Sequence, residues 1–235
     1  MGLREHKKAQ TRQHIAQTAW RLFADRGFEQ VTVAHIAREA EVAVATVFNY
    51  FPTKEDLVFS RLEAFEAQLV DAVATRAVGE PVLAAFRRHL LSSGGLLAQV
   101  AAGDAQALER LRTVNRVIAD SPALLARERQ AIAHTADALA ALLAAETGAR
   151  ADDLRPEAAA NALVGIQRAM VDYTRCRVLA DEQPARLATD VRRLGQRAFA
   201  LLERGLGDYA VRPARPAQAP TATHSSKHTR AESAR

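Results

Sequence analysis

The hydrophobic positions along the chain recur every three to four residues, as they do in amphipathic α-helices. In the first such stretch, Ile15, Ala19 and Phe23 fall at positions i, i+4 and i+8, which places them on one helical face. No stretch shows a convincing alternation of apolar and polar residues, so the sequence predicts an all-α fold. The predicted helices cover residues 7–26, 33–40, 44–50, 54–77, 82–93, 104–119, 122–146, 156–179 and 184–207.

Five prolines stand at or just before the start of a predicted helix, where the absent N–H group costs nothing. Capping residues support several of these boundaries. Ser121 is placed to cap the helix that begins with Pro122, and Thr53 and Asp56 have the spacing of a capping box. Gly148 is a suitable C-terminal cap for the long helix that begins with Pro122. The five prolines at the predicted helix starts are Pro52, Pro81, Pro122, Pro156 and Pro184.

Composition agrees with a helical protein. The chain has 235 residues, of which 49% are hydrophobic and 5% aromatic, and alanine and leucine dominate over strand-forming residues. This length suffices for one sizeable core, or for a small domain and a larger one. A single cysteine, Cys176, excludes an internal disulfide and a cysteine-based zinc site. The charged N-terminus and the lack of a long uncharged apolar run predict a cytoplasmic protein without membrane contact.

The formal net charge of +5 is concentrated at the C-terminus. Residues 211–235 carry five basic residues and one glutamate, a net +4, which leaves +1 for the other 210 residues. The last segment is also rich in Pro, Ser, Thr and Ala, so residues 209–235 are predicted to form a disordered basic tail. The high overall charge therefore does not by itself indicate nucleic-acid binding by the folded part.

Two short predicted helices, 33–40 and 44–50, are separated by about three residues, which is typical of a helix-turn-helix unit. In such units the N-terminal part of the second helix meets base edges in the DNA major groove. Ala43, Val44 and Ala45 are small or apolar, which permits close approach and contact with thymine methyl groups. Val47 and Phe51 are expected to face the core of the small domain.

Polar groups near this unit suit hydrogen bonds to DNA. Thr46, Asn49 and Tyr50 remain on the exposed face of the second helix for phosphates or bases. Lys54 and Thr32 each stand near a helix start, where free backbone N–H groups favour a phosphate. Phosphate contacts give most of the affinity, and base contacts give sequence preference.

The stretch TVAHIAREAEVAVATVFNYFPTKEDLV, Thr32 to Val58, resembles the DNA-binding signature of the TetR/AcrR family of bacterial transcriptional regulators. Upstream, Gly27 and Phe28 stand in matching places, and the resemblance is specific over residues 10–60. It implies an all-helical homodimeric repressor that a small molecule releases from a pseudo-palindromic operator. The expected parts are a three-helix DNA-binding domain at 1–53 and a larger helical ligand-sensing and dimerisation domain at 54–208.

The resemblance also implies roles for single residues. The phosphate-contacting places fall on Thr32, Thr46, Tyr50 and Lys54, and the base-reading places on Ala43, Val44, Ala45 and Asn49. Phe48 belongs to the same DNA-facing helix, at a place where many members have tyrosine. Three departures are Phe48, Glu41 where glycine is usual, and Ala43 where a serine or threonine cap is common. A non-glycine residue at positive φ costs about 1 kcal/mol or more. The basic segment at 4–12, ahead of the first helix, is expected to reach the minor groove or nearby phosphates.

The larger domain is expected to carry a dimer interface on helices 156–179 and 184–207. Small residues at Ala158, Ala162, Gly165 and Ala169 would let a partner helix lie close, with Leu163, Ile166, Met170 and Tyr173 filling the space between. The last helix has a stripe of Leu187, Val191, Leu194, Ala198, Leu201 and Leu202. The alternative is that both stripes form only intramolecular core.

An effector pocket is expected among the helices from 82 to 179, because ligand pockets are mostly apolar with a few polar groups. For each polar candidate the alternative is surface exposure or a satisfied core contact. The candidates are His89, Arg112, Asn115, Arg116, His134, Gln167 and Arg168.

Other functional classes find little support in the sequence. The chain lacks a P-loop, a dinucleotide-binding glycine pattern, a Gly-x-Ser-x-Gly elbow and a His-Glu-x-x-His motif, so we expect neither an enzyme nor a cofactor or metal site. Two alternatives stay open: a DNA-binding regulator that senses no small molecule, and an activator.

Overall fold

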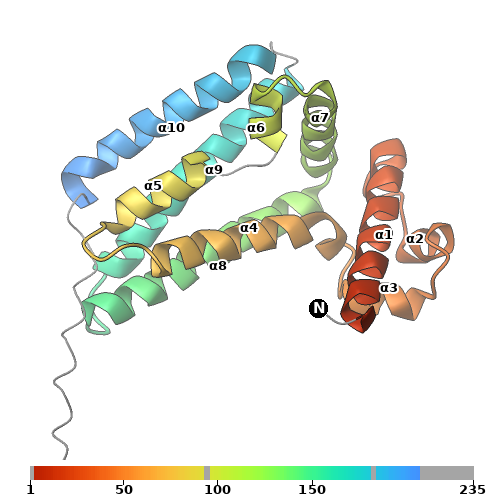
Figure 1. Ribbon diagram of the computed structural model, residues 1–235, viewed down its shortest axis with the longest axis horizontal. Coiled ribbons are helices and arrows are strands. Elements are labelled where there is room, and N and C mark those ends of the chain that lie inside the picture. Colours follow the sequence, from red (N-terminus) through yellow and green to blue (C-terminus); the bar gives the residue numbers. More distant parts are fainter. Residues whose placement is uncertain (1–2, 93–95, 181–183, 207–235) are drawn as a thin grey trace, which may run out of the picture.

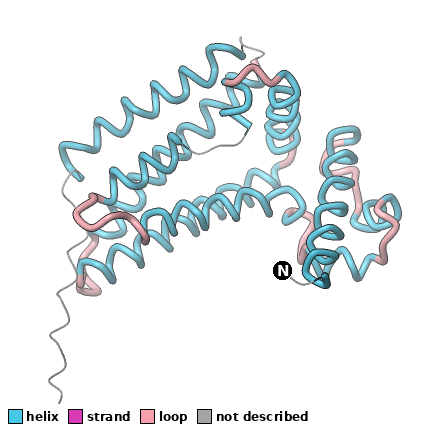
Figure 2. Tube along the Cα trace, viewed as in Figure 1, coloured by secondary structure: helices cyan, strands magenta, loops and turns pink. Residues whose placement is uncertain are grey.

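The structure is a computed structural model that describes residues 3–92, 96–180 and 184–206. Within these ranges the chain is helical and contains no strand, as Figure 2 shows. The predicted tail at 209–235 lies outside the described residues. The helices are α1 (Leu3–Arg26), α2 (Val33–Glu39), α3 (Val44–Tyr50), α4 (Asp56–Ala74), α5 (Val82–Ser92), α6 (Leu96–Ala101), α7 (Ala105–Ala119), α8 (Pro122–Thr147), α9 (Arg155–Leu179) and α10 (Pro184–Leu206).

The nine predicted helices are all present, and their observed boundaries differ from the predicted ones by a few residues. The capping predictions for α8 are confirmed. Ser121 Oγ accepts a hydrogen bond from the Leu124 N–H group, and Gly148 ends α8 with a φ of 62°. The reciprocal bonds expected between Thr53 and Asp56 are also present: Thr53 N–H donates to Asp56 Oδ2 at 2.9 Å, and Asp56 N–H donates to Thr53 Oγ1 at 3.2 Å. They lie in the turn before α4, whose N-cap residue is Glu55 and not Thr53.

The helices form two lobes (Figure 1). The small lobe consists of α1, α2 and α3, which lie together at one end of the molecule. From there α4 runs into a larger lobe, where it lies along α8 and α5. The long helix α9 lies at the centre of the larger lobe, between α8 on one side and α10 on the other. None of the described helices is long and apolar enough to cross a membrane.

The core of the small lobe contains the apolar residues that the helical pattern predicts. Ile15, Phe23 and Ile36 are buried in one cluster together with Val47 and Phe51. Three aromatic rings pack in this region: Phe23 contacts Trp20 edge-on and Phe28 in a tilted arrangement. The inner face of α3, with Val47 and Phe51, therefore anchors this helix to the small lobe.

This core extends beyond the first three helices. Leu57 and Phe59 of α4 belong to the same buried cluster, and so do Val117, Ile118 and Leu124 from the corner between α7 and α8. Two parts of the larger lobe thus contribute side chains to the core of the small lobe. The two lobes share packed apolar surface and are not separated by a simple linker.

Parts of both expected dimer stripes pack within the chain itself. On α9, Leu163 and Ile166 are buried in the chain's own core, and Met170 packs against it. On α10, Leu187 and Val191 are buried in a second cluster of the larger lobe. These four buried residues are therefore intramolecular core, whereas Leu201, in the last turns of α10, is 70% exposed. The exposed positions of α9 include the small residues Ala158, Gly165, Ala169 and Cys176, with the charged Arg168 and Asp172 beside them.

Candidate nucleic-acid interface

The turn between α2 and α3 has the hydrogen bonds of a Schellman motif. Val42 N–H donates to the Ala37 carbonyl oxygen at 3.0 Å, and Glu41 N–H donates to the Arg38 carbonyl oxygen at 3.2 Å. Such a motif needs a left-handed residue after the helix, and Glu41 has a φ of 52°. Among the described residues it is the only non-glycine residue with positive φ. Glu41, which stands where glycine is usual, therefore strains the backbone of this turn.

Helix α3 presents a continuous exposed face. Ala43, Val44, Ala45, Phe48 and Asn49 are exposed, although two of them are large apolar side chains. Val44 retains 40% and Phe48 46% of its accessible surface. Apolar side chains left in water in a short helix suit contact with another surface.

The remaining polar positions of α3 lie at the edge of this face. Thr46 and Tyr50 are half-buried, and Tyr50 packs against the core of the small lobe. Ala43, the N-cap residue of α3, makes no side-chain hydrogen bond to the first turn of the helix, as expected from the missing serine or threonine. The predicted contact residues of α3 therefore share one surface, and the two inward positions are buried.

Thr32 and Lys54 lie at the starts of the neighbouring helices. Thr32 caps α2, because its Oγ1 accepts the His35 N–H group at 3.1 Å. The threonine hydroxyl still has its own proton to donate to a phosphate. Lys54 donates from Nζ to the carbonyl oxygens of Phe28 at 3.0 Å and of Val31 at 3.2 Å. This second role of Lys54 is not visible in the sequence, since both partners are more than twenty residues away.

The basic N-terminal segment is helical and does not form an arm ahead of the first helix. Helix α1 begins at Leu3, so residues 4–12 belong to its first turns. Lys7, Lys8 and Arg12 are exposed there, and the Arg12 guanidinium lies 5.0 Å from the centroid of the Phe51 ring. This contact places one cation next to the C-terminal end of α3. The basic residues are therefore held on a rigid helix beside the candidate interface.

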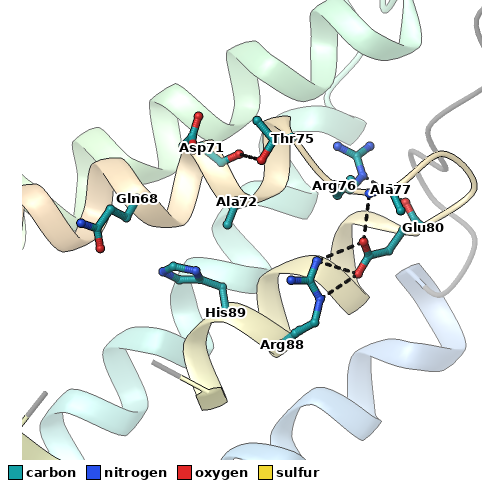
Figure 3. A pocket seen from close by; sticks show the side chains of 9 residues that line it. All are labelled: Gln68, Asp71, Ala72, Thr75, Arg76, Ala77, Glu80, Arg88 and His89. Carbon is teal, nitrogen blue, oxygen red and sulfur yellow. Dashed lines mark hydrogen bonds and ion pairs between the residues drawn. The ribbon is translucent and has the colours of Figure 1, made fainter. Parts of the chain in front are cut away.

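The larger lobe has an open depression of about 600 Å³ between α4 and α5. His89 of α5 faces Gln68 and Ala72 of α4 across it (Figure 3). Burial and the neighbouring Arg88 guanidinium lower the pKa of His89, which favours the neutral imidazole. The other residues along it are Asp71, Thr75, Arg76, Ala77, Glu80 and Arg88.

His89 is the one predicted effector-binding residue that lines this depression. Asn115 is buried and donates from Nδ2 to the Leu111 carbonyl oxygen at 2.8 Å, so it is a satisfied core contact. Gln167 is only 2% exposed. Arg112 forms an ion pair with Glu109, and His134 is exposed, as are Arg116 and Arg168. Within the described part of the chain, the other candidates do not line the depression between α4 and α5.

Metal-binding side chains are also dispersed. Across the described ranges, no three His, Cys, Asp or Glu residues lie close enough together to hold a metal ion. Cys176 is exposed on α9, not buried as a lone cysteine usually is.

Two family models match the chain over most of its length. The model described as "Bacterial regulatory proteins, tetR family" matches residues 15–60, and the one described as "MftR C-terminal domain" matches residues 80–207. The first match covers the helix-turn-helix unit, and the second covers most of the larger lobe.

Curated relatives agree with these matches. The chain is similar to the HTH-type transcriptional regulator TcmR of Streptomyces glaucescens, with 29% identity over 65% of this chain and 67% of that protein. It is also similar to the putative mycofactocin biosynthesis transcriptional regulator MftR of Mycobacterium tuberculosis, with 28% identity over 68% of this chain and 77% of that protein. A short stretch of 47 residues is 53% identical to the HTH-type transcriptional regulator LuxR of Vibrio harveyi, which covers 20% of this chain and 23% of that protein.

The fold is also similar to that of a solved structure, the SmeT–triclosan complex. The two chains superpose with a TM-score of 0.53 at 18% identity, over 90% of this chain and 99% of the other. At this level of identity the similarity concerns the arrangement of the helices and not the ligand.

Proposed function

The chain belongs to the TetR family of bacterial regulatory proteins, and from this premise we propose that it is a homodimeric repressor that a small molecule releases from its operator. As a member of this family it is a DNA-binding transcriptional regulator and not an enzyme. The observation that carries the proposal is the geometry of α3. Its inner face is fixed by buried Val47 and Phe51, while Val44, Phe48 and Asn49 are left exposed.

We assign this exposed face to the DNA major groove. In this assignment Ala43, Val44, Ala45 and Asn49 meet base edges, and Phe48 lies beside them. The phosphate contacts come from both sides of α3. They are Thr32 at the start of α2, Thr46 and Tyr50 at the edge of α3, and Lys54 just before α4. A regulator that binds chromosomal DNA works in the cytoplasm, which we propose as the location of this protein.

A homodimer is supported by the exposed face of α9. Ala158, Gly165 and Ala169 are exposed, and a Cβ atom added at Gly165 would meet nothing within 4 Å in the same chain. Small side chains along one face let a second helix approach closely. A two-fold dimer presents two copies of α3 to two half-sites about one helical turn apart, or a multiple of this spacing. We therefore propose that α9 and the exposed side of α10 form the interface.

We propose that the effector binds in the larger lobe. This lobe combines apolar clusters with the open depression between α4 and α5, which His89 and other polar side chains line. Ligand sites commonly pair apolar surface with a few polar groups. A thermal-shift screen tests it, because a ligand that binds the folded state raises the melting temperature by mass action. A hit must also weaken DNA binding. A ligand-free mode of regulation is indicated if a broad screen yields no such compound.

DNA selection tests the core of the proposed function. The purified protein is incubated with a pool of random duplexes, and the bound duplexes are sequenced. We expect a pseudo-palindromic sequence and two chains, or a multiple of two, on each selected duplex. A pool that stays random at low salt, or a single chain on an asymmetric site, contradicts the proposal.

A further inference from the structure

The turn between α1 and α2 is held by two parts of the larger lobe at once. On one side Lys54, just before α4, donates to the carbonyl oxygens of Phe28 and Val31. On the other side Ser121, at the corner between α7 and α8, donates its hydroxyl proton to Glu29 Oε1 at 2.5 Å. The residues that are held lie within four consecutive positions. The start of α4 and the start of α8 therefore both fix the same short turn.

Ser121 makes two hydrogen bonds with different roles. Its Oγ atom accepts the Leu124 N–H group at 3.3 Å and so caps α8. Its proton goes to Glu29, at a distance typical of an O–H group bound to a carboxylate. A hydroxyl group can donate once and accept twice, so both bonds exist together. The cap of α8 is thereby tied directly to the small lobe, across 92 residues of sequence.

The polar link lies above packed apolar surface. Val117, Ile118 and Leu124, which flank Ser121 along the chain, are buried in the same cluster as Phe28 and Val31, which flank Glu29. Packed interiors have few voids and do not deform continuously. A movement of the α7–α8 corner therefore carries the α1–α2 turn with it while the link is intact.

The turn leads directly to the candidate DNA-binding surface. Thr32, the cap of α2, follows Val31 in the chain and holds the His35 N–H group. We propose that Glu29 and Ser121 are positioning residues for DNA binding: their hydrogen bond sets the place of Thr32 and α2 according to the place of α8. This inference rests on the proposed function, because it assumes that the α2–α3 surface binds DNA. It adds a route by which a change in the larger lobe reaches that surface.

Two substitutions of Glu29 isolate the hydrogen bond from the charge. Both Glu29→Gln and Glu29→Ala remove one negative charge near DNA, but only glutamine keeps an oxygen that accepts the Ser121 proton. Each is made in the full chain with Ser121 and again with Ser121→Ala. Binding is measured by fluorescence anisotropy, with a duplex selected by the wild-type protein and a scrambled duplex. A double-mutant cycle separates the pairwise effect from the loss of the α8 cap in Ser121→Ala.

With Ser121 present, we expect Glu29→Ala to bind the selected duplex about 3- to 10-fold more weakly than Glu29→Gln. The two variants should show the same dependence of affinity on salt, because no phosphate contact is lost. With Ser121→Ala the difference between alanine and glutamine should disappear. Equal affinities of Glu29→Ala and Glu29→Gln in the Ser121 protein overturn the proposal.

Hydrogen exchange gives a readout that needs no DNA. Amides in residues 28–36 should exchange faster in Glu29→Ala than in Glu29→Gln, and again only when Ser121 is present. If exchange does not differ, the link is overturned whether or not the protein binds DNA. If exchange differs but DNA affinity does not, the link exists without positioning the surface, and the proposal is also wrong. A wild-type protein that binds no duplex refutes the proposed function, and exchange still decides the link.

Discussion

The Nζ atom of Lys54 lies 3.9 Å from the centroid of the Phe28 ring and donates a hydrogen bond to the carbonyl oxygen of the same residue at 3.0 Å. The lysine thus fixes the turn before α2 while its charge stays at the edge of the candidate DNA surface. An ammonium group over an aromatic face is favourable by about 0.5–1 kcal/mol at an exposed site. Lys54 therefore has a structural role in addition to the proposed phosphate contact.

Replacing Lys54 with methionine keeps the apolar stem and removes the charge. We expect weaker binding to selected and scrambled duplexes alike. The slope of log affinity against log salt concentration should become less negative by about 0.9 for each chain bound. Fluorescence anisotropy at several salt concentrations measures this slope. Lys54→Arg keeps the charge and serves as the matched control. An unchanged slope in Lys54→Met means that the charge of Lys54 serves only the internal contacts.

The strained turn before α3 gives a prediction for Glu41. With a φ of 52°, Glu41 pays the steric penalty of a left-handed conformation, and Glu41→Gly should stabilise the protein by about 1 kcal/mol. For a chain of this size that raises the melting temperature by about 2–4 °C. Amides of α3 should also become better protected against exchange. Differential scanning fluorimetry and hydrogen exchange measure the two effects.

Glu41→Ala is the control for this prediction. Alanine removes the carboxylate but keeps the Cβ atom that causes the strain. It should therefore leave stability nearly unchanged. Equal stabilisation by alanine and glycine would mean that charge repulsion, and not backbone strain, is the unfavourable feature of Glu41.

The proposed dimer interface gives a prediction for Gly165. A side chain at this position meets nothing within 4 Å in its own chain, so Gly165→Arg should leave the monomer folded. If α9 packs against a partner, the long charged side chain prevents association. We expect a monomer by analytical ultracentrifugation and DNA binding reduced by at least tenfold.

Two further glycine variants control for effects on folding. Gly165→Ala should keep the dimer and, because alanine favours helix, raise stability by up to about 1 kcal/mol. Gly195→Ala is the contrasting case inside the chain, because its added Cβ atom would lie 2.8 Å from Met170 Sδ and the methionine side chain must shift to make room. A dimeric Gly165→Arg protein contradicts the proposed interface.

A buried arginine secures the far end of the larger lobe. The Arg76 side chain is fully buried and pairs with Glu146 at 2.6 Å, which joins the end of α4 to the end of α8. It also donates to the carbonyl oxygens of Val73 at 2.7 Å and Glu80 at 3.0 Å. Arg76→Met leaves these acceptors without their donors, and we expect a loss of about 2–3 kcal/mol in the free energy of unfolding.

An exposed ion pair provides the comparison for Arg76. Arg150 and Asp152 retain 86% and 77% of their side-chain surface, and such pairs contribute little. Arg150→Met should therefore change stability by less than about 0.5 kcal/mol. Urea denaturation of both variants measures the difference. Similar midpoints for the two would contradict the role of Arg76 as a structural anchor.

The elements that local pattern determines were predictable from the sequence. Caps such as Ser121 and Gly148, and the inward face of α3 at Val47 and Phe51, follow from spacing and residue type within one turn of helix. The strain at Glu41 was also foreseeable, because the turn geometry fixes the sign of φ whatever residue is present. These features depend on neighbours close in sequence.

Helix α6 shows the limit of local pattern. Its six residues, Leu96–Ala101, follow two glycines and are too few to form a stable helix alone. The helix exists because it packs against α7 and α10, with Val100 buried between them. Tertiary contact, and not propensity, determines this element.

Long-range contacts explain what the sequence did not show at the site. The link between Glu29 and Ser121 and the bonds of Lys54 join residues far apart in the chain, and no spacing rule identifies them. The same holds for α9. The helical spacing of its apolar residues does not tell which face packs against α8 and which face is left for a partner chain. Residue type alone also does not place a side chain in a cavity, and among the effector candidates His89 lines the described depression.

The central claim is that α3 reads bases in the major groove, and Asn49→Ala tests it most directly. Asparagine recognises adenine through two hydrogen bonds, and one such contact contributes about 1–3 kcal/mol of discrimination. Random-pool selection with the variant should therefore return the wild-type consensus with preference relaxed at one base pair in each half-site. Val44→Ala should relax a different pair. If neither variant changes the selected sequence, α3 does not read the DNA and the account is wrong.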